Sequence, residues 1–288
     1  MNSTVVWGRR CAAALMAIMA LLLVGFPADR ACVAGDPETP GDGEQKPGDA
    51  EKPKDEEKPK DAIKVTWHGH ACFTIEAPDG TKIVTDPFGA SVGYRLPDLQ
   101  ADIVLVTHDH ADHNSASTVR GEPVLLKGKE GIGKRSIKGI NIVGVDSLHY
   151  DKDADKERGY NTIYSFEIAG VRFCHLGDLG RKLTTKQKSE IGKADVLMIP
   201  VGGKVTLDSA AVESMISLFS PRIVLPMHYK TKVMKDEDWP LTTLDDFLKG
   251  KKPDLVIRKE SNTAEVSKST LPKRQEIWVL EYEEKRPK

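Results

Sequence analysis

The chain has 288 residues, and its 42 basic side chains nearly balance its 43 acidic ones, which leaves a formal net charge of -1. Nucleic-acid-binding domains neutralise phosphates with a strong basic excess, so this composition argues against strong nucleic-acid binding. Hydrophobic residues make up 39% of the chain. The part of the chain that follows residue 61 is long enough for one α/β domain with a sizeable core.

The first 34 residues have the pattern of a secretory signal peptide. An arginine pair at 9–10 precedes the apolar run 11–26, which is shorter than the roughly 20 residues of a transmembrane helix. Small residues at Cys32 and Ala34 offer a cleavage site after Ala34. The alternatives are lipidation of Cys32 and an uncleaved anchor, which would limit membrane association to the N-terminus. We expect an exported protein, either periplasmic or extracellular.

Residues 35–62 consist almost entirely of Pro, Gly, Lys, Asp and Glu, and the pentapeptide Glu-Lys-Pro-Lys-Asp occurs at both 51–55 and 57–61. A segment with so little apolar surface cannot offset the entropy of ordering its backbone. We therefore predict a disordered, partly extended tether between the signal peptide and the folded domain.

From residue 63 onward, short β-rich runs alternate with a few helical patterns. The predicted strands are Ile63–Trp67, Cys72–Glu76, Lys82–Thr85, Ile103–Thr107, Ile140–Val145, Thr162–Ile168, Val171–His175, Val196–Ile199 and Ile223–Pro226. The predicted helices are Thr184–Ile191, Leu207–Phe219 and Leu241–Leu248. Many strands with few helices indicate an α/β fold of two stacked sheets flanked by helices, in a single domain over residues 63–270.

Two other stretches are harder to place. Residues 271–288 are predicted to form a terminal strand at Ile277–Leu280 followed by a charged tail. The glycine- and lysine-rich stretch Gly128–Lys134 is predicted to be a turn, because it lacks the spacing of a phosphate-binding loop.

The segment 107–113 reads Thr-His-Asp-His-Ala-Asp-His and directly follows the apolar run 103–106. On an extended backbone, residues two apart point to the same side, so His108 and His110 can share one ion. Asp112 and His113 face another direction if the chain turns there. Imidazoles and a carboxylate packed this densely call for a cation. The segment therefore predicts two neighbouring metal positions.

With its pattern His-x-His-x-Asp-His, this segment resembles the signature of the metallo-β-lactamase-fold hydrolase superfamily. The resemblance continues through Ser-Leu-His at 147–149, His-Leu-Gly-Asp at 175–178 and Pro-Met-His-Tyr at 226–229. It implies a four-layer αβ/βα sandwich. The opening Trp-His-Gly-His-Ala at 67–71 and the Thr-Asp-Pro-Phe at 85–88 are most similar to the branch that includes L-ascorbate-6-phosphate lactonase and many uncharacterised metal-dependent hydrolases.

The resemblance also implies the ligands of two divalent metal ions. His108, His110 and His149 would hold the first ion, Asp112, His113 and His228 the second, and Asp178 would bridge the two. Nitrogen and oxygen donors of this kind suit Zn²⁺, with Mn²⁺ or Fe²⁺ as alternatives. Taken alone, His149 reads as a surface histidine, Asp178 as a helix cap and His228 as a turn residue. Their order along the chain favours the ligand role.

Four further side chains are predicted to support this centre or to meet the substrate. Asp86, at a strand end, is predicted to accept a hydrogen bond from a ligating imidazole. His70 is expected to line the mouth of the pocket. Lys204 and Tyr229 stand where an oxyanion or phosphate could be met, although both also read as ordinary loop residues.

Three residues near these motifs are not assigned to the centre. By strand alternation His175 points away from Asp178, which predicts a supporting or core position. Cys72 and Cys174 are the cysteines of the predicted domain. In an exported protein they could pair, but two buried thiols fit the predicted strands equally well.

The predicted chemistry is hydrolysis of an ester-like bond, such as a lactone or a phosphodiester, in a small molecule by a metal-activated hydroxide. Asp178 and Asp112 are the predicted catalytic carboxylates, the first setting the spacing of the ions and the second able to accept a proton. The alternatives are a non-catalytic zinc-stabilised binding protein and a phospholipid or nucleic-acid phosphodiesterase. Seven ligands exceed the four of a tetrahedral structural site, which favours an enzyme.

The signal peptide leads to a prediction about the mature chain. Protein isolated from its native host should begin near Gly35, because signal peptidase would cut after Ala34. Intact-mass measurement tests this expectation. A mass that includes the apolar run would indicate an anchor, and a diacylglycerol adduct on Cys32 would indicate a lipoprotein.

Overall fold

A computed structural model describes residues 59–149, 159–235 and 239–283. The predicted signal peptide, and the tether as far as residue 58, lie outside the described residues. The elements below all belong to one compact unit, Asp55–Lys288. None of the helices in the described ranges has both the length and the hydropathy needed to cross a bilayer.

The first sheet has six strands in the order β13-β1-β2-β3-β4-β5. Its strands are β1 (Ile63–Gly69), β2 (Cys72–Glu76), β3 (Lys82–Thr85), β4 (Ile103–Val106), β5 (Val124–Lys127) and β13 (Thr263–Val266). In this order, neighbouring strands are antiparallel from β13 to β3 and parallel from β3 to β5.

The second sheet has eight strands in the order β12-β14-β11-β10-β9-β8-β7-β6. Its strands are β6 (Gly133–Ile137), β7 (Ile140–Leu148), β8 (Tyr160–Ile168), β9 (Val171–His175), β10 (Val196–Pro200), β11 (Ile223–Met227), β12 (Val256–Arg258) and β14 (Glu276–Val279). From β9 to β12 the pairing is parallel. The predicted terminal strand is β14, which lies inside this sheet between β11 and β12.

The described helices are short. They are α1 (Gly128–Gly131), α2 (Thr185–Ile191), α3 (Ser209–Phe219) and α4 (Leu244–Leu248), with the 3₁₀ turns η1 (Ala90–Val92), η2 (Ala116–Thr118) and η3 (Pro253–Leu255). Caps set where the longer ones begin. The Asp208 side chain accepts a hydrogen bond from the Ala211 amide, and Thr184 and Thr243 form capping boxes at α2 and α4. Helix α4 starts three residues later than predicted.

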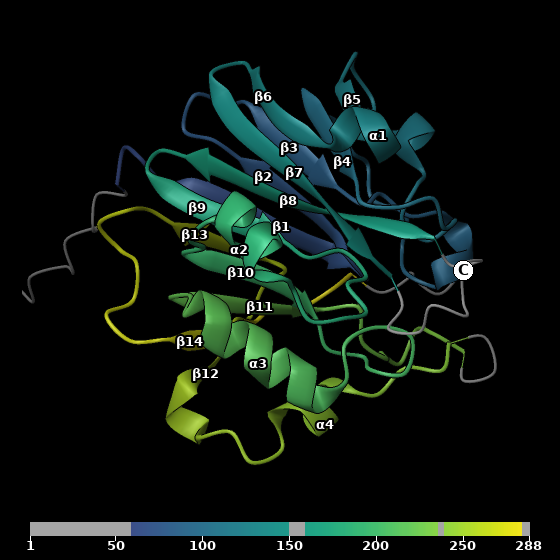
Figure 1. The fold of residues 1–288 in the computed structure, drawn as a ribbon, viewed down its shortest axis with the longest axis vertical. Helices are drawn as coiled ribbons and strands as arrows, with labels where there is room; N and C mark the ends of the chain where they lie inside the picture. The colour runs from purple at the N-terminus through teal and green to yellow at the C-terminus, as the bar shows by residue number, and fades with distance from the viewer. Residues whose placement is uncertain (1–58, 150–158, 236–238, 284–288) are drawn as a thin grey trace, which may run out of the picture. The chain divides into compact units, whose positions relative to one another are not determined.

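Apolar side chains fill the space between the sheets and also cover the outer face of the first sheet. In β4, Ile103 and Leu105 belong to the inner core, whereas Val104 and Val106 point to the opposite face and belong to a second apolar cluster with Phe88. Strands buried on both faces read as continuous apolar runs, which is why β4 is recognisable in the sequence. Helices α2 and α3 pack on the second sheet (Figure 1), so the predicted αβ/βα sandwich is confirmed.

Two expectations are settled here. The stretch Gly128–Lys134 is not a simple turn, because it forms α1 and the start of the edge strand β6. That strand has no buried apolar alternation, so its sequence carries no strand signal. Cys72 and Cys174 are both buried free thiols, and they do not form a disulfide.

A glycine pair lets α1 approach the second sheet closely. A Cβ on Gly144 in β7 would overlap the carbonyl oxygen of Gly131 in α1, and a Cβ on Gly131 would overlap the Tyr164 hydroxyl. Gly144→Ala should therefore lower the free energy of unfolding by about 1–3 kcal/mol, as overpacking does in closely packed interiors. Urea denaturation measures this change. Gly89→Ala is the control, because its Cβ would meet only the movable Ser115 side chain at 3.3 Å. Equal effects of the two substitutions would contradict the close approach.

Candidate metal centre

The seven predicted ligands converge from four places in the fold. His108, His110, Asp112 and His113 lie on the loop after β4, His149 follows β7, Asp178 follows β9, and His228 follows β11. Parallel strands present their carboxyl ends at one edge of a sheet, and loops from that edge can meet. The potential ligand atoms form three overlapping groups. Within each group, all the atoms lie within 4.8 Å of one another.

The first group is formed by His108, His110 and His149. Nε2 of His108 lies 3.1 Å from Nδ1 of His110, and the His149 ring centroid lies 4.8 Å from each of the other two. The side chains of His108 and His149 are almost fully buried, whereas His110 is half-buried. This group therefore has one side that solvent can reach.

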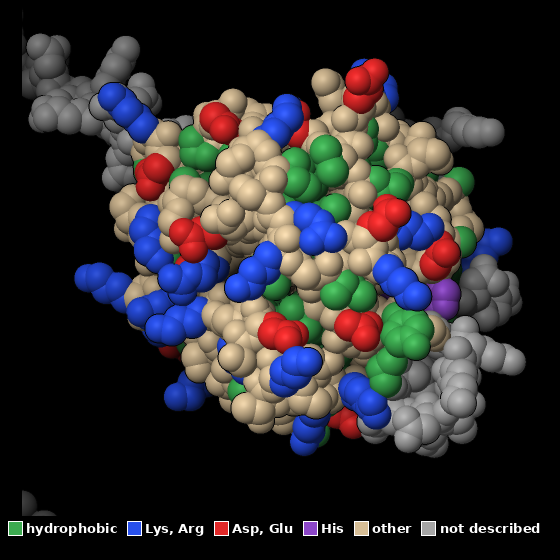
Figure 2. Space-filling model, turned by 45° about the horizontal axis from the view of Figure 1, so that its top comes forward, with side chains coloured by type: hydrophobic (Ala, Val, Ile, Leu, Met, Phe, Trp, Pro, Cys, Tyr) green, Lys and Arg blue, Asp and Glu red, His purple; other side chains and the backbone are tan. Residues whose placement is uncertain are grey.

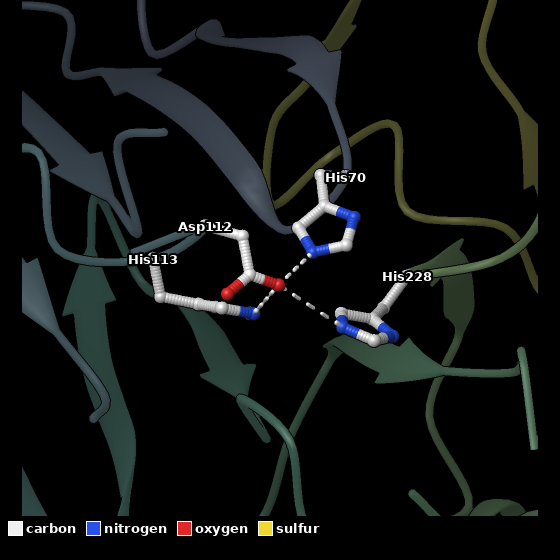
Figure 3. A group of neighbouring side chains, drawn as sticks. All are labelled: His70, Asp112, His113 and His228. Carbon is white, nitrogen blue, oxygen red and sulfur yellow. Dashed lines mark hydrogen bonds and ion pairs between the residues drawn. The ribbon is translucent and has the colours of Figure 1, made fainter. Parts of the chain in front are cut away.

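The second group contains Asp112, His113 and His228, as predicted, and in addition His70 (Figure 3). Oδ2 of Asp112 lies 2.8 Å from Nε2 of His70, 3.4 Å from Nε2 of His113 and 3.9 Å from Nε2 of His228. His70 is completely buried. Our expectation that it lines the pocket mouth is wrong, because the turn between β1 and β2 folds its ring inward, onto Asp112.

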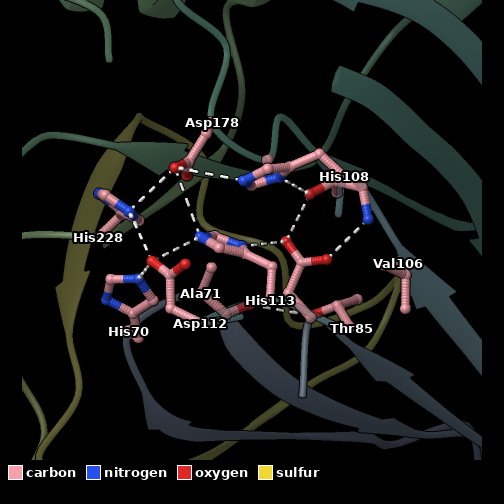
Figure 4. Close-up of polar contacts among 12 residues, drawn as sticks. His70, Ala71, Thr85, Val106, His108, Asp112, His113, Asp178 and His228 are labelled. Atoms are coloured by element: carbon pink, nitrogen blue, oxygen red, sulfur yellow. Dashed lines mark hydrogen bonds and ion pairs between the residues drawn. The ribbon is translucent and has the colours of Figure 1, made fainter. Parts of the chain in front are cut away.

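Asp178 lies between the two groups (Figure 4). Its Oδ2 is 3.2 Å from Nε2 of His149 in the first group and 3.0 Å from Nε2 of His228 in the second. The same oxygen is 3.4 Å from Nε2 of His113. One carboxylate oxygen thus reaches imidazoles of both groups, which is the placement required of a bridging ligand.

Asp86 supports imidazoles in both groups at once. Its Oδ2 accepts hydrogen bonds from Nδ1 of His113 at 2.9 Å and from the Thr107 hydroxyl at 2.8 Å. Because that hydroxyl spends its one proton on Asp86, it accepts from Nδ1 of His108, 2.9 Å away. When both rings are neutral, as metal binding requires, their Nε2 atoms are left with lone pairs that point into the cluster. The contact between Asp86 and an imidazole that we predicted is present.

The unsatisfied atoms of the cluster are suited to a cation. Nε2 of His113, Nε2 of His228 and Oδ1 of Asp178 are buried without a hydrogen-bond partner among the described residues. Such groups cost free energy unless something binds them. Nitrogen and carboxylate donors that converge in this way form the donor set of a divalent-metal centre.

The charges in the cluster have the same implication. Burial by itself would raise the pKa of Asp178, but the imidazoles of His113 and His228 hold it well below its usual range. Burial would lower the pKa of His113, yet the carboxylates of Asp178 and Asp112 raise it well above its ordinary value. The buried carboxylates therefore favour positive charge at the centre, which divalent ions would supply.

The structure separates the two substrate candidates. Lys204 lines a cavity of about 370 Å³ together with the ligand candidate His149, and Arg181 lies on the same wall. Tyr229 is instead only 5% exposed and packs on Trp67 with ring centroids 5.5 Å apart. It belongs to the core, because the chain has already turned away from the centre after His228.

The comparisons with known proteins agree with this geometry. A family model described as the beta-lactamase superfamily domain matches residues 64–228. A UPF0173 metal-dependent hydrolase of Pyrococcus furiosus is 32% identical over 233 residues, which cover 71% of this chain and 100% of the relative. Another, from Thermoplasma volcanium, is 32% identical over 192 residues, which cover 59% of this chain and 84% of the relative.

A solved structure from Thermotoga maritima, assigned to the zinc-dependent hydrolases of the metallo-β-lactamase superfamily, is 36% identical with a TM-score of 0.62. The match covers 76% of this chain and 98% of that one. Fold, donor set and relatives together define a metal-dependent hydrolase. The chain belongs to the metallo-β-lactamase superfamily.

The position of Asp86 leads to a prediction about metal retention. Asp86→Asn can still accept from the Thr107 amide, but its NH₂ group cannot accept from the Thr107 hydroxyl or from His113. We expect metal affinity to fall by about 10–100-fold, as it does when a partner of a ligating histidine is lost. Competition with a chelator measures this.

Asp102→Asn is a matched control, because Asp102 accepts from the Lys82 amide and pairs with Lys138 outside the cluster. Full metal retention in Asp86→Asn would show that the ligands hold their orientation without this carboxylate.

Proposed function

We propose that the protein is an exported two-metal hydrolase that cleaves an ester-like bond, such as a lactone or phosphodiester, in a small molecule. Zinc suits the donor set, and manganese or iron are the alternatives. The observation that carries the proposal is the position of Asp178, whose Oδ2 reaches His149 of one group and His228 of the other. A one-metal structural site would not need a carboxylate there.

The chain would hold the two ions in an asymmetric setting. His108, His110 and His149 supply three imidazoles to the first position, whereas the second has Asp112 as well as imidazoles. Bound ions of this kind polarise the scissile bond and acidify a water at neutral pH. The protein would orient the Nε2 lone pairs of His108 and His113 toward the ions through Asp86. It would also exclude bulk water from all but one side of the centre.

Asp112 is the carboxylate best placed to handle a proton. Its side chain is 15% exposed, whereas those of Asp178 and Asp86 are 3% and 0% exposed. A group that takes a proton from attacking water must be reachable by that water. Asp178, which is enclosed by imidazoles, would instead fix the spacing and charge of the two positions.

Two cavities flank the first group and could receive the substrate. The cavity of about 370 Å³ beside His149 has Arg181, Lys182 and Lys204 in its wall. A larger one, of about 700 Å³, is lined by His108 and His110. Volumes of this size suit a small molecule, and the basic wall favours a substrate that carries an anionic group.

The near-zero net charge of the chain favours a small substrate over a polyanion. On the face shown in Figure 2, basic and acidic side chains are interspersed, apart from one gathering of Lys and Arg on the left. A nucleic-acid phosphodiesterase would use a basic tract continuous with its active site.

Assays with lactone, phosphodiester, thioester and β-lactam substrates, with metal content measured on the same samples, would test the proposed activity. A metal-loaded protein inactive on all of them would favour a zinc-stabilised binding protein.

The bridging position of Asp178 leads to a prediction about catalysis. Asp178→Asn keeps the shape of the side chain but removes its charge, so one of the two ions should be held more weakly. We expect turnover to fall by about 10²-fold or more on whichever substrate proves active. The acid limb of the rate profile should move to higher pH, because weaker ion pairing makes the attacking water harder to deprotonate.

Asp98→Asn is the control for loss of a carboxylate, because Asp98 is exposed and pairs with Arg120 at the surface. A folded Asp178→Asn protein with unchanged metal content, rate and pH profile would exclude the bridging role.

A further inference from the structure

We propose that His70 is a positioning residue whose Nε2–H donates to the Asp112 carboxylate and so fixes this ligand of the second group. The inference rests on the proposed two-metal site but not on the identity of the substrate. His70 lies 42 residues before Asp112 in the chain. His70 lies in the turn between β1 and β2, and only the fold brings it next to Asp112 (Figure 3).

The hydrogen bond has ordinary geometry. Nε2 of His70 and Oδ2 of Asp112 are 2.8 Å apart, and the imidazole is fully buried. The other nitrogen, Nδ1, is buried without a hydrogen-bond partner among the described residues. The two nitrogens therefore have different roles, and Asp112 is the partner of only one of them.

The location of the proton follows from this difference. Nε2 of His113 and Nε2 of His228 are buried without a hydrogen-bond partner among the described residues, whereas Nε2 of His70 is paired with Asp112. Because a carboxylate can only accept, the neutral His70 ring makes this bond with its proton on Nε2. With the proton on Nε2, only a lone pair of Nδ1 is left unused. The geometry thus favours a ring that donates to Asp112 over one that serves as a further ligand.

The backbone of the turn is strained and firmly held. His70 has a φ of 52°, which costs a residue other than glycine about 1–3 kcal/mol unless its surroundings determine it. Its carbonyl accepts from Nε1 of Trp67 at 3.1 Å and from the backbone amide of His228 at 3.1 Å. The second of these bonds ties the turn directly to another residue of the second group.

The next residue is held in the same way. The Ala71 carbonyl accepts from the Thr85 hydroxyl at 3.2 Å and from Nε2 of His175 at 2.9 Å. Nδ1 of His175 accepts from the Gly177 amide, so its proton is on Nε2, as this bond requires. A Cβ at residue 69 would overlap the Tyr94 ring, which explains the glycine before His70.

Among the predicted ligands, His70 contacts those of the second group. The ring centroids of His70 and His228 are 4.1 Å apart, whereas His108, His110 and His149 are grouped without His70. Loss of the donor should therefore weaken one ion and leave the other in place.

Two substitutions in the full chain separate a donor from a ligand. His70→Gln places an amide NH₂ near the position of Nε2 and can still donate to Asp112, whereas His70→Phe keeps the ring volume without a donor. For Zn²⁺ titrated into metal-free protein, we expect His70→Phe to weaken the second binding step by about 10–100-fold and His70→Gln by only a few-fold. The first step should be unchanged in both variants.

His68→Gln is the matched control. His68 lies two residues earlier, and its Nε2 is paired with the Thr74 hydroxyl at 2.8 Å, away from the cluster. This substitution should change neither binding step.

A double-mutant cycle tests whether His70 acts through Asp112. In an Asp112→Asn background, His70→Phe should cause little further loss, because the two residues would form one unit. Additive losses would overturn the inference. A loss with His70→Gln as large as with His70→Phe would also overturn it and would make His70 a ligand.

A metal-independent measurement separates this inference from the proposed function. Nitrogen-15 spectra of the histidine rings in metal-free wild type should show His70 protonated at Nε2, and a proton at Nδ1 would overturn the inference. Wild-type protein that binds a single ion but has the Nε2–H form of His70 would instead refute the two-metal proposal alone.

Discussion

Three carboxylates among imidazoles, two of them buried and one partly exposed, are the constraint on which the rest of this structure depends. Asp86, Asp112 and Asp178 lie within one cluster, and the side chains of the first and last are almost fully buried. Carboxylates in such surroundings are stable only when hydrogen bonds or cations compensate them. Asp86 is compensated by the protein itself, through Thr107 and His113. Asp178 has imidazoles around it, and its Oδ1 has no hydrogen-bond partner among the described residues.

Three of the seven described non-glycine residues with a positive φ belong to the same cluster. His70, Asp86 and His228 all have positive φ angles, of 52°, 38° and 50°. Residues other than glycine avoid this region unless neighbouring contacts determine their conformation. Each of the three stands at the end of a strand or in a tight turn, where a left-handed residue turns a side chain back toward the edge of the sheets. The strain is thus part of how loops from two sheets bring side chains to one point.

The hydrogen bonds around the two groups differ in kind. The first group depends on the loop after β4 and on Thr107, whose hydroxyl donates to Asp86 and accepts from Nδ1 of His108. The second group is also fastened to the first sheet by the β1–β2 turn, where the His70 carbonyl accepts from the His228 amide. Two positions with different supports need not have equal affinities for a metal, because partners beyond the ligands tune both orientation and basicity.

The sequence by itself determined the ligand-bearing loop and the class of fold. Four of the seven predicted ligands lie within residues 108–113, so local backbone geometry after an apolar strand brings them together. It also indicated most of the core strands, because β4, β10 and β11 are buried on both faces and read as apolar runs. Edge strands such as β6, which bury little, carried no such signal.

Only the tertiary structure decided which distant side chains meet this loop and in what role. His70 and Tyr229 both stand beside motif residues in the sequence, yet one is turned onto Asp112 and the other into the core against Trp67. The direction of each side chain is set by a single positive-φ residue, at position 70 or 228, and by hydrogen bonds between the two sheets. The periodicity of apolar residues in the sequence cannot predict such a change of side-chain direction, because it assumes a regular helix or strand. The site lies where the regular strands end.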